Sequence, residues 1–240
     1  MERISVIAPV YNERENVSRF ISRVEQTLKK RFDSYEIIMI DDGSTDGSNE
    51  ILDREASVNG HVKVYHFTEN NGQTAALSAG FKICSGDLVV TMDSDLQTDP
   101  EDIYHLMGYI DDYDMINGKR ETREDGLKRK ISSLVGNGMR NFITGDNIQD
   151  TGCPLKLFKK EVVKSYVLFE GMHRFLPTLA KMNGFRVIEI PIRHYDRKFG
   201  KSKYGVFNRA FKGLKDAFAV RWMKKRMLHY KIEEGEDEDV

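Results

Sequence analysis

The sequence predicts an α/β fold with a mostly parallel sheet flanked by helices. Apolar runs of strand length alternate with segments in which apolar residues recur at the helical period of about 3.6 residues. Turns rich in Asp, Asn and Gly follow these runs, and such alternation is typical of parallel strands joined by helices. The 240 residues, 40% of them hydrophobic, allow one sizeable core and leave little room for a second full domain.

The N-terminal half contributes four expected strands and the helices between them. The strands are the runs Ile4–Val10, Ile37–Ile40, Val62–Phe67 and Leu88–Met92. The helices are expected to begin near Glu13, near Ser48, at residues 71–73 and after Pro100. Asn12 is expected to cap the first of these helices, because its side-chain oxygen can accept a hydrogen bond from a free backbone N–H group.

Beyond Asp111 the alternation weakens. The expected elements there are a strand at Met115–Gly118, a basic helix at 126–144, a Gly- and Asp-rich turn at 145–154, a helix at Met172–Asn183 and a strand at Phe185–Pro191. This part of the chain is expected to complete the pocket that the first half begins.

The C-terminal region differs from the rest in charge. Residues 201–231 contain ten Lys and Arg against one acid, Asp216, although the whole chain has a net charge of −1. Residues 233–240 contain six acids. We therefore expect a folded domain at 1–200 that carries the site, a basic amphipathic helical extension at 201–232, and a disordered acidic tail at 233–240.

Neither the cysteines nor the N-terminus indicates a secreted protein. Cys84 and Cys153 are too few for a disulfide framework. The first strand-like run begins at Ile4, without the features of a signal peptide. No stretch approaches the roughly 18 to 20 uninterrupted apolar residues that span a bilayer. The expected location is the cytoplasm, or the surface of a membrane that faces it.

Three polar turns follow strands of the predicted sheet, at Pro9–Glu13, Asp41–Ser44 and Asp93–Gln97. Because ligands of open parallel sheets bind beyond the carboxyl ends of the strands, these turns are expected to line one crevice. Asp93, Asp95 and the amide oxygen of Gln97 can converge on one hard divalent cation, Mg²⁺ or Mn²⁺, that keeps positions for diphosphate oxygens. The Asp-Ser-Asp triplet alone would equally fit a polar turn that caps the next helix.

These three turns, read together, resemble the family-2 glycosyltransferases with the GT-A (Rossmann-like) fold. Within that family the sequence resembles the dolichyl- and undecaprenyl-phosphate sugar transferases, such as dolichol-phosphate mannose synthases. Further matching motifs lie at Asn117–Arg120, Leu127–Ser132, Asp150–Lys156, Gly171–Phe175 and Arg197–Gly205. The resemblance covers about residues 3 to 226 and implies an enzyme of cell-envelope or glycan biosynthesis.

The resemblance implies an activity: inverting, metal-dependent transfer of a sugar from a GDP- or UDP-sugar to a polyprenyl phosphate. The nucleotide-sugar is expected to contact Pro9, Tyr11, Glu13, Asp42, Gly72, Gln73, Asp93 and Ser94. The metal ligands are expected to be Asp93, Asp95 and Gln97. The nucleotide can be GDP or UDP. The sugar can be mannose, glucose, N-acetylglucosamine or a modified sugar. Two contacts have simpler alternatives: Glu13 also fits a charge in a helical first turn, and residues 71–73 a plain helix start.

Basic residues imply the acceptor. Guanidinium groups bind phosphate through paired hydrogen bonds, so the catalytic set expected beside Asp95 is Arg120, Arg129, Asp150, Arg197 and Lys203. A phosphate oxygen is already an anion, so no strong general base is expected, and catalysis rests on positioning and electrostatics. Asp150 is expected to hydrogen-bond the sugar or to organise the basic loop, and a plain structural turn also fits it.

Apolar and basic residues interleave between Tyr204 and Ile232, which suits one or two amphipathic helices in a lipid interface with Trp222 at headgroup depth. The alternative is that the apolar side packs on the catalytic domain. Many members of the resembled family continue into transmembrane helices, whereas this sequence ends here. Reversible membrane attachment, or an integral-membrane partner protein, is therefore expected.

Rival functions fit less well. A processive polysaccharide synthase would have Gln-x-x-Arg-Trp, but Phe218 stands in place of the Gln. A nicotinamide-dependent oxidoreductase would have a G-x-G-x-x-G loop after the first strand. A basic binding or scaffold protein would leave Asp93 and Asp95 unexplained, and no nucleic-acid partner is expected. A glycosyltransferase that acts on a protein or a soluble glycan remains the alternative.

Overall fold

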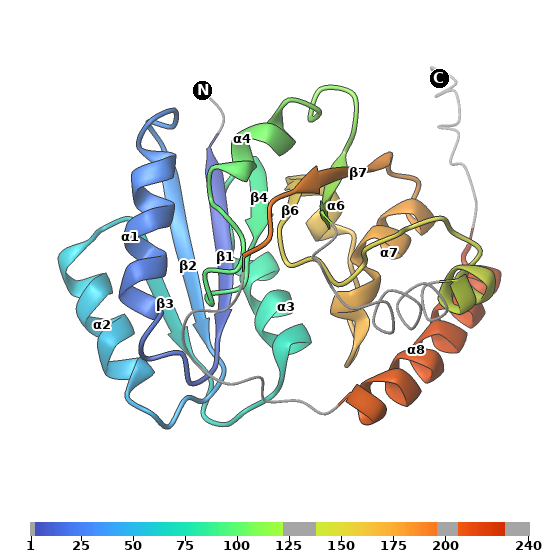
Figure 1. Cartoon of the computed structure of the whole chain (residues 1–240), viewed down its shortest axis with the longest axis horizontal. Coiled ribbons are helices and arrows are strands. Elements are labelled where there is room, and N and C mark those ends of the chain that lie inside the picture. The colour runs from blue at the N-terminus through green and yellow to red at the C-terminus, as the bar shows by residue number, and fades with distance from the viewer. Residues whose placement is uncertain (1–2, 122–137, 196–205, 229–240) are drawn as a thin grey trace, which may run out of the picture.

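The structure, a computed structural model, describes residues 3–121, 138–195 and 206–228 (Figure 1). A seven-stranded sheet with the order β3-β2-β1-β4-β6-β5-β7 forms its centre. The strands are β1 (Ile4–Val10), β2 (Tyr35–Asp41), β3 (Val62–His66), β4 (Leu88–Thr91), β5 (Met115–Arg120), β6 (Lys156–Lys159) and β7 (Val187–Ile192). Only β6 runs antiparallel to its neighbours, β4 and β5. The mostly parallel sheet that the sequence predicts is therefore confirmed.

Helices cover both faces of this sheet. They are α1 (Val17–Leu28), α2 (Ser48–Val58), α3 (Gln73–Ile83), α4 (Asp102–Met107), α6 (Lys160–Lys164), the 3₁₀ helix η1 (Met172–Phe175), α7 (Leu176–Met182) and α8 (Val206–Arg226). Residues 138–144 are also helical. None of the described helices is both long and apolar enough to cross a bilayer.

Alternating residues of the central strands build two cores. Val6 of β1 packs with residues of α1, α2 and α4, whereas its neighbour Ile7 packs with residues of α3, α6 and α7. Successive side chains of a strand point to opposite faces, so a strand buried on both faces must be apolar throughout. A third core lies beneath α8, where Ala217 and Val220 pack against η1 and α7. Figure 1 shows α8 beside α7, at the end of the molecule opposite α2.

The expected start and cap of the first helix are wrong, and two elements were not expected. Helix α1 begins at Val17 after Asn16, not near Glu13, and Asn12 does not cap it. Asn12 instead has a left-handed φ of 54°, and its side chain contacts the turn after β2. Strand β6 and helix α6 were not expected at all, because their short, lysine-rich sequence shows neither strand alternation nor a helical repeat. The helix expected at Met172–Asn183 is confirmed, and its first turn is the 3₁₀ helix η1, which leads into α7.

Candidate active site

The ends of β1, β2 and β4 meet at one edge of the sheet. The hydroxyl of Ser94 donates a hydrogen bond to the carbonyl of Pro9 at 3.2 Å and joins β4 to β1. The backbone N–H of Asn12 donates to Ser44 Oγ at 2.9 Å, and the N–H of Thr45 donates to Asn12 Oδ1 at 2.7 Å. The three polar turns, at Pro9–Glu13, Asp41–Ser44 and Asp93–Gln97, are thus brought together.

Asp42 at the end of β2 organises the loop that leads into α3. Its carboxylate accepts hydrogen bonds from the N–H groups of Asn71 at 2.7 Å and Gly72 at 2.9 Å, and from the Asn70 amide at 2.9 Å. Burial raises the pKa of Asp42, although these backbone N–H groups act to lower it. Asp42 therefore sets the position of Gly72 and Gln73, two of the residues expected to contact the donor.

The other expected nucleoside contacts lie at the end of β1. Tyr11 is half-buried there. The Glu13 carboxylate accepts a hydrogen bond from the Asn16 amide at 2.7 Å, and the Glu13 N–H donates to Ser48 Oγ at 3.0 Å. The first turn of α1 contains no acid, so the alternative that Glu13 is only a charge in a helical first turn is wrong.

The turn after β4 holds the expected metal ligands. Gln73 Nε2 donates to Asp93 Oδ1 at 3.0 Å, and the N–H of Gln97 donates to Asp95 Oδ1 at 3.1 Å. Leu96 has a φ of 60°, which is uncommon for a residue with a branched side chain, so the chain turns sharply between Asp95 and Gln97. The Gln97 amide nitrogen donates to the Tyr195 carbonyl at 3.2 Å.

The donors of this turn fit a hard cation. Asp93, Asp95 and Gln97 offer only oxygen ligands, which Mg²⁺ and Mn²⁺ prefer. Across the described ranges, no three His, Cys, Asp or Glu side chains form a metal-binding group. A cation held by Asp93 and Asp95 would therefore take its remaining ligands from amide, water or diphosphate oxygens.

On the other side of β4, Arg120 at the end of β5 pairs with Asp150. Arg120 Nε and Nη2 donate to the two carboxylate oxygens at 2.8 Å each, and the Arg120 N–H donates at 3.1 Å. Burial acts to raise the pKa of Asp150, but Arg120 outweighs it and the pKa lies below its usual value. The contact with Asp150 raises the pKa of Arg120 and the charge of Asp93 adds to this. Arg120 thus lies within electrostatic reach of the metal turn.

No role was expected for Lys156, the first residue of β6. Its ammonium group is buried and donates hydrogen bonds to Asn117 Oδ1 at 2.8 Å, to the Thr151 carbonyl at 3.3 Å and to the Cys153 carbonyl. Burial lowers the pKa of Lys156. The available signal for Lys156 in the sequence was its position at the end of the matching motif Asp150–Lys156, beside a strand-like run.

Glu189 of β7 was also missed. Its carboxylate accepts hydrogen bonds from the N–H groups of Gln149 at 2.7 Å and Asp150 at 2.9 Å. Asn117 Nδ2 donates to the Asp150 carbonyl at 2.9 Å and to Glu189 Oε1 at 3.1 Å. Side chains of β5, β6 and β7 together therefore fix the loop that presents Asp150. An acid inside an otherwise apolar strand was the only signal for Glu189.

Three of the expected catalytic residues cannot be placed. Arg129, Arg197 and Lys203 lie outside the described residues, so their roles stay predictions. Of the basic residues expected to bind the acceptor phosphate, Arg120 is the one that the described ranges contain.

The sequence matches a family model and several named relatives. The model of "Glycosyl transferase family 2" matches residues 5–167. The undecaprenyl-phosphate 4-deoxy-4-formamido-L-arabinose transferase of Yersinia pestis (strain Pestoides F) is 36% identical over 208 residues, which are 86% of this chain and 64% of the relative. The same-named protein of Proteus mirabilis (strain HI4320) is 35% identical over 85% of this chain and 63% of its own. The chain thus spans just under two thirds of the length of these curated relatives.

Solved structures share the fold. Glucosyl-3-phosphoglycerate synthase from Mycobacterium tuberculosis, in complex with Mn²⁺ and UDP-glucose, superposes with a TM-score of 0.67 at 16% identity, over 93% of this chain and 79% of that one. A mannosyltransferase from Pyrobaculum calidifontis, in complex with GDP-mannose and Mn²⁺, gives 0.62 at 16% identity, over 93% and 74%. At this identity the likeness concerns the fold alone, and it confirms the GT-A fold. With the family model matching more than half of its length, the chain belongs to glycosyl transferase family 2.

Proposed function

We propose that the protein transfers a sugar from a nucleoside diphosphate sugar to a polyprenyl phosphate at the cytoplasmic face of a membrane, with inversion at the anomeric carbon. Two sets of comparisons support this. The named relatives act, by their names, on undecaprenyl phosphate. Solved structures of the same fold hold Mn²⁺ with UDP-glucose or GDP-mannose.

The observation that carries the choice of acceptor is the ion pair of Arg120 with Asp150. A hydroxyl acceptor, on a protein or a soluble glycan, requires a general base to take its proton. Both Asp150 oxygens instead accept hydrogen bonds from Arg120, and the pKa of Asp150 is lowered, which makes it a weak base. A phosphate acceptor has no such requirement, because its oxygen is already an anion.

The proposed reaction is a direct displacement. A bond forms between an acceptor phosphate oxygen and the anomeric carbon, while the bond from that carbon to the diphosphate breaks and the nucleoside diphosphate leaves. Asp93 and Asp95, with Gln97, would hold Mg²⁺ or Mn²⁺, whose charge offsets that of the diphosphate. Arg120 would hold the acceptor phosphate near the donor, and so would bring two anions together.

Transfer of radiolabel tests the proposal. Purified protein is incubated with polyprenyl phosphate in detergent, Mn²⁺ or Mg²⁺, and a panel of labelled GDP- and UDP-sugars. Metal-dependent label in the organic phase is expected for one donor, and loss of that label on adding a chelator. If a donor is hydrolysed or bound but no lipid is labelled, the acceptor is wrong and a soluble hydroxyl acceptor takes its place.

A further inference from the structure

Helix α8 has two different apolar sides. Ala217 and Val220 are fully buried against the catalytic domain. Phe218 and Trp222 lie one turn apart on the opposite side, and 56% and 62% of their surfaces are exposed. An ordinary solvent-facing side would be polar at these positions. Packing on the domain therefore accounts for one apolar side of α8 and leaves the other without an explanation.

Basic residues surround the two exposed aromatic side chains. Lys215, Phe218, Trp222 and Lys225 follow the spacing i, i+3, i+7 and i+10, so they share one face of the helix. Arg221 and Arg226 border this face and are exposed, as are both lysines. The guanidinium carbon of Arg226 lies 5.9 Å from the Trp222 ring centre. Lys215, Phe218, Trp222 and Lys225 together form the outer face of α8.

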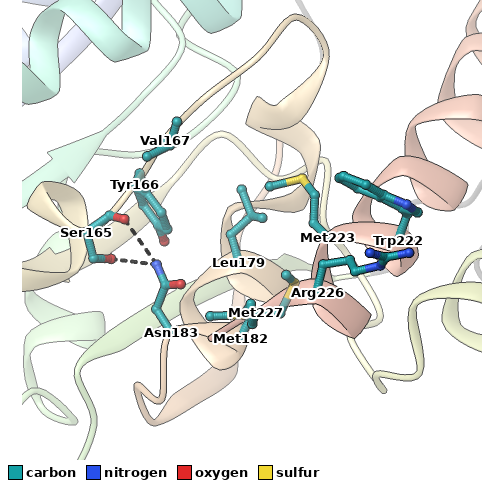
Figure 2. A pocket seen from close by; sticks show the side chains of 10 residues that line it. All are labelled: Ser165, Tyr166, Val167, Leu179, Met182, Asn183, Trp222, Met223, Arg226 and Met227. Atoms are coloured by element: carbon teal, nitrogen blue, oxygen red, sulfur yellow. Dashed lines mark hydrogen bonds between the residues drawn. The ribbon is translucent and has the colours of Figure 1, made fainter. Parts of the chain in front are cut away.

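The apolar surface continues on both sides of α8. A cavity of about 370 Å³ opens beside Trp222, and Figure 2 shows Val167, Leu179 and Met223 around it. On the other side, Arg221 donates a hydrogen bond to the Ile143 carbonyl at 3.4 Å, which brings helix 138–144 against α8. In that helix Phe142 is 82% exposed. Apolar surface that is exposed over several neighbouring elements indicates an interaction site, whereas single scattered apolar residues do not.

We propose that the outer face of α8 lies on an anionic lipid bilayer, with Phe218 and Trp222 among the headgroups. Aromatic rings favour that depth, and lysine and arginine are attracted to anionic lipid. The charge argues against a second copy of this chain as the occupant, because a twofold interface would place the same basic residues against each other. The proposal rests on the proposed function to the extent that a lipid acceptor requires the enzyme to reach a bilayer.

Trp222 offers a direct measurement, because it is the only tryptophan in the chain. Vesicles of phosphatidylcholine with phosphatidylglycerol are expected to shift its emission to shorter wavelength, since the ring leaves water. Brominated acyl chains in the same vesicles are expected to quench the emission, and vesicles of phosphatidylcholine alone to change it little. An emission spectrum unchanged by the anionic vesicles would overturn the proposal.

Flotation with the same vesicles tests the residues. Changing Phe218→Ala and Trp222→Ala together is expected to lower the vesicle partition coefficient about tenfold or more. The matched control is Val58→Ala with Tyr65→Ala, which removes side chains that are 78% and 42% exposed at the other end of the sheet and is expected to change nothing. Equal losses in the two pairs would mean that the outer face is not the contact.

Charge reversal supplies an independent pair of variants. Lys215→Glu with Lys225→Glu is expected to lower partitioning into anionic vesicles about tenfold or more. The control is Arg54→Glu with Lys82→Glu, which makes the same change at exposed residues of α2 and α3 and is expected to lower partitioning far less. If the control lowers partitioning as much as the test pair, net charge explains the binding and the proposed face is wrong.

The vesicles contain no polyprenyl phosphate and no nucleotide-sugar, so their result is independent of the transfer reaction. Transfer to acceptor in detergent micelles tests the proposed function without a bilayer. A different outcome is that the protein does not bind vesicles of pure lipid but binds native membranes, and that protease treatment of those membranes abolishes binding. This outcome would indicate a membrane-protein partner and overturn the bilayer proposal.

Discussion

The two halves of the molecule build their parts of the site in different ways. In the N-terminal half, from β1 to the turn after β4, short turns at the strand ends hold one another through backbone groups, as when Asp42 accepts from Asn71 and Gly72. In the C-terminal half, from β5 to β7, Lys156 and Glu189 reach a loop from separate strands. Backbone groups of the strand-end turns therefore hold the first half of the site together, and buried polar side chains of the strands hold the second.

The largest expected effect tests whether the N-terminal half carries the metal chemistry. Asp95→Ala removes a buried carboxylate of the metal turn, and transfer is expected to fall at least about a thousandfold, because the cation contributes several kcal/mol of charge stabilisation. Initial rates of lipid labelling measure this. Asp111→Ala, at an exposed acid in the loop before β5, is the control and should keep its rate. A rate within tenfold of wild type in Asp95→Ala would remove Asp95 from the metal site.

The sequence could predict the N-terminal half because its elements are regular. The runs that form β1, β2 and β4 are buried on both faces, so they are continuous apolar stretches in the sequence. The polar turns that follow these strands indicate where the site lies. Asn12 is the exception, because its left-handed backbone depends on hydrogen bonds with Ser44 and Thr45, which a local capping rule does not contain.

The C-terminal half was harder to predict for a physical reason. Strand β6 has only four residues and begins with a charged one, Lys156, so it lacks the apolar alternation of a strand. Its burial is made possible by three acceptors, namely the Asn117 side chain on β5 and the carbonyls of Thr151 and Cys153 in the preceding loop. Sequence pattern alone gives no indication of which buried charge will find such partners.

The second prediction tests this dependence on a buried charge. Lys156→Met leaves the acceptors around the ammonium group without a donor, and is expected to lower the free energy of unfolding by about 3 to 5 kcal/mol. Urea unfolding at neutral pH measures the loss. Lys164→Met removes an exposed lysine of α6 and should cost less than about 0.5 kcal/mol. A Lys156 variant as stable as its control would mean that the C-terminal half does not depend on this side chain.

The N-terminal half also buries a charged side chain away from the site, that of Glu36 in β2. It accepts hydrogen bonds from Ser5 at 2.6 Å, Lys63 at 2.7 Å and Ser85 at 2.7 Å. Burial acts to raise the pKa of Glu36, but these donors outweigh it and lower the pKa from 4.5 to about 2. The folded state therefore favours the ionised form, and this stability is present above pH 4.5 and is lost as the pH falls toward 2.

The third prediction follows from that pKa. Glu36→Gln is expected to lower the free energy of unfolding by about 3 kcal/mol at pH 7, with little change in the Michaelis constants for donor and acceptor. The difference from wild type should shrink as the pH falls below 4.5. Urea unfolding at several pH values measures it, with Glu15→Gln at an exposed position as control. A difference that is constant with pH would mean that the charge of Glu36 is not the cause.

The variant with the smallest expected effect tests whether the C-terminal half of the site serves the acceptor and the N-terminal half the donor. Arg120→Lys keeps the positive charge but cannot donate in parallel to both oxygens of Asp150, as Arg120 does at 2.8 Å. We expect kcat/KM for the polyprenyl phosphate to fall about tenfold, which corresponds to about 1.4 kcal/mol, while the affinity for the nucleotide-sugar stays the same. Steady-state kinetics with each substrate varied in turn measures both. If donor affinity falls equally, Arg120 serves the diphosphate, the two halves share one anion site, and Arg120 does not hold the acceptor phosphate.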